Sequence, residues 1–128
     1  MIYSLGILTK KLLYPKISPK KTVLKLDYGT IHQLDIEFPS GCSSLVGVQI
    51  KKGLHQVYPS NANGYFTGDD TKISFRENYL LTSAPFVLDI WTWNDDTAWD
   101  HTILIRIGLL RQYFGKKITS FDDLPVLS

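Results

Sequence analysis

The sequence is poor in cysteine, and this scarcity limits the kind of protein that it can encode. Cys42 is the single cysteine among 128 residues, so the chain cannot form an internal disulfide or a metal cage built from several thiolates. Small secreted domains often depend on such crosslinks, whereas a lone cysteine is typical of chains made in a reducing cytosol. We therefore expect one domain that is stabilised by its hydrophobic core.

Long apolar runs are also missing. A membrane-spanning helix needs roughly 20 consecutive apolar residues, and no stretch of this sequence approaches that length. The beginning, MIYSLGILTKKLLYPK, places apolar residues before basic ones, which is the reverse order of a secretory signal, and it lacks a small-residue cleavage site. These features predict no membrane association, no signal peptide and synthesis in the cytoplasm.

Acidic residues are absent from the first 26 positions. The whole chain has a net charge of +2 and this stretch has +6, so the remaining residues carry −4. Its six lysines are Lys10, Lys11, Lys16, Lys20, Lys21 and Lys25. Such a segment can dock on an acidic neighbouring subunit, neutralise phosphates or remain a solvated terminus. We interpret residues 1–20 as a basic, partly apolar arm, and we expect nucleic acid as a partner only through this arm.

Helical periodicity is scarce, and alternating apolar and polar residues run through most of the chain. TVLKLDY, LDIEF and LVGVQIK alternate with a period of two, and turn-forming residues separate them. Seven or eight short strands at a spacing of roughly ten residues predict an all-β, antiparallel two-sheet β-sandwich. The missing Cys–Trp–Cys pattern argues against an immunoglobulin domain, so we prefer a jelly-roll-like fold. We place the sandwich at residues 21–112 and a C-terminal tail at residues 113–128.

The segment DIWTWNDDTAWDHTILIRIGLL, residues 89–110, contains two strand-like runs on either side of an acidic connection. We predict that the runs form a hairpin in which Asp89 lies opposite Arg106 and Trp91 lies opposite Leu104. Opposite charges and apolar partners then meet across the two strands. In this register both faces of the sheet are apolar. The short polar side chains between the runs are typical of a turn.

The acids of this connection are also candidate metal ligands. Asp95, Asp96 and Asp100 would offer oxygen ligands to calcium together with Asp69 and Asp70 if their two loops meet. The spacing lacks the alternating acids of an EF-hand, so we favour the interpretation that these acids shape their loops. The three histidines include no His-x-His pair, which argues against a cupin-type metal centre. The lone cysteine has no neighbouring base, and we expect no catalytic residue, metal or cofactor.

Aromatic residues gather near the same segment. Trp91 and Trp93 fall on one face of a strand, Trp99 lies in the following loop, and Tyr65 belongs to the connection PSNANGYFTGDD. Core packing, sugar stacking and a subunit interface each account for such a group. We prefer the interface because a lone sandwich has nothing to cover a second apolar face. The interface candidates are Trp91, Trp93, Leu104, Lys10, Lys11, Lys20 and Lys21, and the sugar-binding candidates are Trp91, Trp93, Trp99 and Tyr65.

Residues 43–110, with VYPSNANGYFTGDD and FVLDIWTWNDDTAWDHTILIRIGLL, resemble the small all-β structural proteins of tailed phages and other viruses. The resemblance covers about half the chain and centres on WNDDTAWDHT. It implies a non-enzymatic virion component, such as a decoration, minor capsid or head-to-tail protein, that assembles with its own copies and with other virion proteins. It carries over no site residue. The alternatives are a carbohydrate-binding sandwich module and, third, a metal-dependent enzyme.

Overall fold

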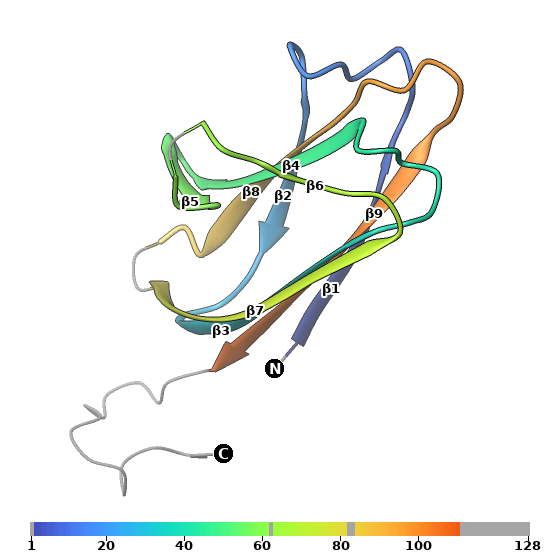
Figure 1. The fold of residues 1–128 in the computed structure, drawn as a ribbon. Helices are drawn as coiled ribbons and strands as arrows, with labels where there is room; N and C mark the ends of the chain where they lie inside the picture. Colours follow the sequence, from blue (N-terminus) through green and yellow to red (C-terminus); the bar gives the residue numbers. More distant parts are fainter. Residues whose placement is uncertain (1, 62, 82–83, 111–128) are drawn as a thin grey trace, which may run out of the picture.

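The computed structural model describes residues 2–61, 63–81 and 84–110 as two β-sheets packed face to face (Figure 1). The first sheet contains β1 (Ile2–Thr9), β3 (Gly29–Phe38), β7 (Thr71–Leu81) and β9 (His101–Leu110). The second sheet contains β2 (Lys20–Lys25), β4 (Val46–Lys52), β5 (His55–Tyr58), β6 (Phe66–Thr67) and β8 (Val87–Asn94). No helix in the described ranges is long and apolar enough to span a membrane.

The order of the strands is that of a jelly roll. The first sheet runs β1-β9-β3-β7 and the second runs β2-β8-β4-β5, with β6 also paired to β4. β1 thus pairs with β9, β2 with β8, β3 with β7 and β4 with β6, as in a long antiparallel ribbon that has been rolled up. This nested pairing of two sheets is the jelly-roll architecture. The predicted all-β, jelly-roll-like sandwich is therefore confirmed.

The core lies between the two sheets and follows the period-two pattern of the sequence. On β9, Ile103, Ile105 and Ile107 are fully buried, whereas the intervening Leu104 and Arg106 are only partly buried. β3, β4 and β8 supply corresponding inward rows, which include Leu34, Ile36, Phe38, Val46, Val48, Ile50, Leu88 and Ile90. Full burial of one such side chain contributes about 1.5–3 kcal/mol. These rows are therefore the main source of stability.

The hairpin predicted for residues 86–109 is wrong. β8 belongs to the second sheet and β9 to the first, so the two strands share no hydrogen-bonded ladder. The carboxylate of Asp89 lies 3.8 Å from the ammonium group of Lys21 on β2, and Arg106 pairs in register with Asp35 on β3. The charge pattern was misleading because Asp89 and Arg106 each have an oppositely charged neighbour within their own sheet.

The sandwich begins at Ile2 and not at residue 21, so the predicted arm requires correction. β1 pairs with β9 along its whole length. Its alternate residues Tyr3, Leu5 and Ile7 face the core, and Ile7 is buried there. Apolar residues at every second position are sufficient to bind this segment to the sheet. The predicted tail at residues 113–128 lies outside the described residues.

Trp93 on β8 packs flat against the neighbouring strand β4 at Gly47. The two residues are partners in register, and only 4% of Trp93 is exposed. A Cβ atom placed on Gly47 would lie 2.2 Å from two carbon atoms of the indole ring, which is far inside van der Waals contact. The missing side chain at position 47 therefore allows a tryptophan to be buried on the outer face of the second sheet.

We expect Gly47→Ala to destabilise the fold by about 1–3 kcal/mol, because the added methyl group must displace a packed indole ring. Gly6→Ala is the matched control, since its new Cβ would lie 3.4 Å from the nearest atom of Leu104, an ordinary contact. Urea unfolding of both variants measures the change in the free energy of unfolding. Equal stability of the two variants would show that the indole is not held against Gly47.

Candidate functional site

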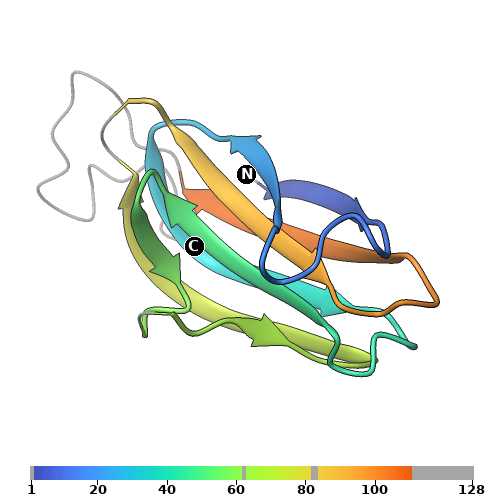
Figure 2. The same ribbon diagram turned by 90° about the horizontal axis from the view of Figure 1, so that it is seen from above.

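Four connections between the sheets meet at one end of the sandwich, which we call the loop end. They are residues 10–19, 39–45, 68–70 and 95–100, and they lie opposite the end at which β9 finishes (Figures 1 and 2). Main-chain hydrogen bonds join them: the amide of Ser44 donates to Gly68, that of Asp95 to Leu45 and that of Asn94 to Tyr14. The loop end is therefore one surface built from segments that are far apart in the sequence.

Two acids of the β8–β9 connection hold the lysine-rich segment in place. Asp95 Oδ1 accepts a hydrogen bond from the backbone amide of Lys16 at 2.9 Å, and Asp100 Oδ1 accepts one from the backbone amide of Lys11 at 2.8 Å. Lys11 Nζ also donates to the carbonyl oxygen of Ala98 at 3.0 Å. The segment that was expected to reach a neighbouring copy therefore docks on its own chain.

Asp96 organises the same connection from within. Its Oδ1 accepts the amide of Ala98 at 2.8 Å, and its Oδ2 lies 2.9 Å from His101 Nε2. The hydrogen bond from Ala98, followed by that from His101, lowers the pKa of Asp96 below its usual value. Asn94 Oδ1 accepts the amide of Asp96, and Asn94 Nδ2 donates to the carbonyl oxygen of Trp99. Each acid of this connection therefore has a structural role.

The described residues contain no group of three or more histidine, cysteine, aspartate or glutamate side chains that could hold a metal ion. The two acidic loops do meet at the loop end, as the calcium interpretation required. Asp69 Oδ1, however, accepts the amide of Gly41 at 2.9 Å. The carboxylates thus point to separate main-chain donors and not to a common centre.

Cys42 is fully buried beneath the loop end. Its burial, together with the nearby charges of Asp69 and Asp96, raises the pKa of the thiol to about 11. A nucleophilic cysteine needs a lowered pKa and access to its substrate. The fold thus brings Cys42 into the electrostatic range of the Asp96–His101 pair but leaves the thiol protonated and enclosed, as a residue of the core.

Large apolar side chains are exposed at the loop end. Their exposed fractions are 71% for Leu12, 59% for Leu13, 93% for Ile17, 40% for Leu45 and 69% for Trp99. The same connections and their borders carry Lys10, Lys11, Lys16 and Lys20. Single exposed apolar side chains are ordinary, whereas several at one end of a fold are typical of interaction surfaces. We call this group the apolar patch.

Trp93 and Tyr65 pack on each other, which buries Trp93 and leaves Tyr65 41% exposed. Their ring centroids are 5.1 Å apart in an edge-to-face arrangement, and Lys16 Nζ lies 4.1 Å from the centroid of the Tyr65 ring. With only 4% of its surface exposed, Trp93 offers no open face to a sugar. Trp99 lies in the β8–β9 connection. The sugar-binding candidates therefore belong to two parts of the fold, the outer face of the second sheet and this connection.

Trp91 and Leu104, which the predicted hairpin placed together, lie on different sheets. Trp91 is on the outer face of the second sheet, where Lys21 Nζ and Lys51 Nζ lie 5.8 Å and 5.6 Å from its ring centroid. Its Nε1 is buried and has no hydrogen-bond partner in the described part of the chain. Leu104 is on the outer face of the first sheet beside Gly6. The interface candidates thus do not form a single surface.

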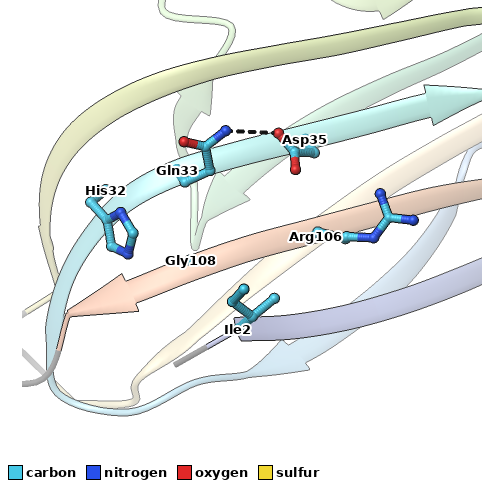
Figure 3. A pocket seen from close by; sticks show the side chains of 6 residues that line it. All are labelled: Ile2, His32, Gln33, Asp35, Arg106 and Gly108. Atoms are coloured by element: carbon cyan, nitrogen blue, oxygen red, sulfur yellow. Dashed lines mark hydrogen bonds between the residues drawn. The ribbon is translucent and has the colours of Figure 1, made fainter.

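The outer face of the first sheet is hollowed where β3 contains a bulge. The register of β3 shifts between Ile31 and Gln33 against both neighbouring strands. A hollow of about 350 Å³ results, lined by Ile2, His32, Gln33, Asp35, Arg106 and Gly108 (Figure 3). The sequence gives no signal for this hollow, because a bulge interrupts the alternation of β3 by only one residue.

Asp35 is the acid of this hollow, and it is held in the ionised form. The Ser74 hydroxyl and the Gln33 amide donate to its Oδ1 and lower its pKa, and the charges of Lys72 and Arg106 act in the same direction. A general acid needs a raised pKa, and a general base works best with a pKa near the operating pH. Asp35 therefore fits neither role.

Comparisons with protein-family models and with curated proteins gave no match. Among solved structures, the chain is similar to the coat protein of Tobacco streak virus, which was solved as a dimer. The two share 12% sequence identity with a TM-score of 0.36, and the alignment covers 97% of this chain and 94% of the other. At this TM-score the similarity is a likeness in outline, so no contact or partner of that protein is transferred.

The lowered pKa of Asp96 predicts a loss of stability in acid. Because the folded loop favours the ionised carboxylate, its contribution is fully present above the unfolded pKa of about 3.9 and is lost as the pH falls through the lower folded value. Asp96→Asn should therefore reduce stability at neutral pH and flatten the acid side of the stability curve. Urea unfolding across this pH range measures the effect, with the exposed Asp70→Asn as the control. An unchanged acid side in Asp96→Asn would contradict the assignment.

We expect neither a chelator nor added calcium to change the melting temperature, because Asp95, Asp96 and Asp100 already accept main-chain hydrogen bonds. A bound ion at a hundredfold excess over its dissociation constant would stabilise the fold by about 2.7 kcal/mol, which is readily visible in thermal unfolding. A melting temperature that falls with EDTA, recovers with calcium and loses this response in Asp96→Asn would establish a metal site instead.

Proposed function

We propose that this chain is a non-enzymatic structural protein that assembles with copies of itself as a component of a virion. The observation that supports the proposal most strongly is the apolar patch at the loop end. Burial of exposed apolar surface by a partner favours association by roughly 25 cal/mol per Å². The acids nearest the patch accept hydrogen bonds within the chain, so the side chains that remain available for a partner there are mainly apolar.

The fold narrows the alternatives because jelly rolls serve mainly as capsid, lectin and cupin domains. A cupin needs clustered metal ligands, and the described residues contain no such cluster. A lectin needs open aromatic faces, whereas Trp93 is closed by Tyr65. Assembly needs exposed apolar area on a rigid scaffold, and the loop end offers this. We place the protein in a virion for two reasons. Among the jelly-roll proteins, the capsid proteins are the ones that function by assembly, and residues 43–110 resemble viral structural proteins.

Carbohydrate binding is the second candidate, and one observation favours it. Trp99 is 69% exposed and lies beside the acids of the β8–β9 connection. An open indole face with polar neighbours can stack on a sugar ring. In that case a single tryptophan, and not the expected group of aromatic residues, would provide the stacking surface.

The mass of the full-length protein in solution tests the proposal. We expect light scattering to detect oligomers whose mass rises with protein concentration. Ile17→Lys and Trp99→Lys should each lower this mass, because they place a charge in a contact that loses water on assembly. Leu54→Lys is the matched control, since Leu54 is fully exposed in the β4–β5 turn, away from the loop end.

Two results would count against self-assembly through the loop end. Equal loss of mass in Leu54→Lys would indicate a general effect of added charge. A monomer at every concentration, retained on a polysaccharide column unless Trp99 is replaced, would instead support the carbohydrate-binding module.

A further inference from the structure

The edges of the two sheets are protected to different degrees. An edge strand presents unpaired N–H and C=O groups, and monomeric proteins guard such edges with charged residues, proline, bulges or short strands. β2 carries Lys20, Lys21 and Lys25, and β7 carries Lys72, Arg76 and Glu77 beside an irregularity in its pairing. β5 and β6 are only four and two residues long. Each of these edges therefore resists pairing with another chain.

β1 carries none of these protections in its own sequence, and the charge at its edge comes from Lys20 of β2, which donates to the carbonyl oxygen of Leu8. The sequence of β1, IYSLGILT, contains eight residues without a charge or a proline, and its register with β9 is unbroken. Among the described residues, no strand pairs with its other side. Ile2 is 71% exposed and Leu8 is 43% exposed, while Tyr3 and Leu5 of the core are only partly buried. A long edge strand of this kind, without charged side chains of its own, is suited to strand addition.

The carbonyl group of Leu8 indicates which residues direct their backbone groups toward the open edge. It accepts a hydrogen bond of 2.8 Å from Lys20 Nζ, which belongs to the edge strand of the other sheet. Backbone groups point alternately toward and away from the partner along an antiparallel strand. Ile2, Ser4 and Gly6 therefore share the orientation of Leu8 and offer their N–H and C=O groups to a further strand. At Leu8 the carbonyl oxygen must accept the new hydrogen bond beside that of Lys20 or in its place.

We propose that β1 of one copy pairs antiparallel with β1 of a second copy about a two-fold axis at Leu5. The pairing joins the two four-stranded sheets into one continuous sheet. Ile2 then lies opposite Leu8 of the other copy, and Ser4 lies opposite Gly6. The proposal depends on the self-assembly proposed above and identifies one of its interfaces, which is distinct from the loop end.

This register is favoured because it satisfies three conditions at once. It pairs the residues whose backbone groups face the open edge with each other. It brings the two exposed apolar side chains of the outer face, Ile2 and Leu8, into contact across the strands. On the inner face it places Tyr3 opposite Ile7 and Leu5 opposite its own copy, which covers the partly exposed margin of the core. A shift by two residues in either direction would leave both Ile2 and Leu8 without an apolar partner.

Gly6→Pro and Ser4→Lys test the pairing in the full-length chain. Proline at position 6 removes an N–H that faces the open edge and leaves the hydrogen bonds to β9 intact. Lysine at position 4 adds the kind of charge that guards the other edges. Sedimentation velocity should show the dimer dissociation constant rising by about tenfold or more in each variant, which corresponds to about 1.4 kcal/mol. Leu80→Lys, at an exposed position on the opposite edge strand β7, is the matched control and should dimerise like the parent.

Hydrogen exchange at the amides of Ser4 and Gly6 provides a second measurement. In the parent protein, exchange at both amides should slow as the concentration rises, because only the dimer protects them. Protection that is the same in a dilute monomer would overturn the proposal, since another segment of the same chain would then cover this edge. Oligomers that persist unchanged in both folded β1 variants would refute the β1 interface while leaving self-assembly in place. A monomer at every concentration would refute both.

Discussion

The packing of two facing rows of aliphatic side chains is the constraint on which the rest of the structure depends. Ile36 and Ile105 on the first sheet and Ile50 and Ile90 on the second are fully buried in one core. Because the long strands give alternate residues to this core, the sheets must lie face to face, and most successive strands cross between them at the ends. The connections are therefore gathered at the two ends of the sandwich, and the loop end is a direct result of this packing.

At the loop end, polar groups are satisfied within the chain while apolar ones are left outside. Asp95, Asp96 and Asp100 accept main-chain amides, which fixes the β8–β9 connection against residues 10–19. Leu12, Leu13 and Ile17 of that segment remain in contact with water. This distribution is the reverse of what solubility alone would favour, and it suits a rigid surface that is completed by another molecule.

The two proposed contact surfaces differ in symmetry and in the physical basis of their interactions. Pairing of β1 with its own copy is isologous and closes after two subunits. It depends on backbone hydrogen bonds, which need no particular side chain but are disfavoured by charged side chains on the edge strand. The loop end would act through apolar area and a lysine rim, so its contacts respond more strongly to salt. A protein with both surfaces can form dimers and then join the dimers through a second contact, as assembly of a shell requires.

The class of the fold and much of the core follow from the pattern of amino acids along the chain. The alternation in LDIEF and TILIRIGLL predicts the same inward residues that the structure buries. In a strand with alternating apolar and polar residues, only one of the two faces can be the buried one. The sequence did not determine which strands pair. Asp89 can pair with Lys21 as well as with Arg106, because several strand registers bring opposite charges together. The predicted partner, Arg106, was therefore wrong. Three further features became apparent in the folded molecule: β1 belongs to the first sheet, Gly47 accommodates Trp93, and the acidic loop holds the lysine-rich segment. Each of these depends on contacts between residues distant in the chain, and such contacts become defined only when the two sheets close over their common core.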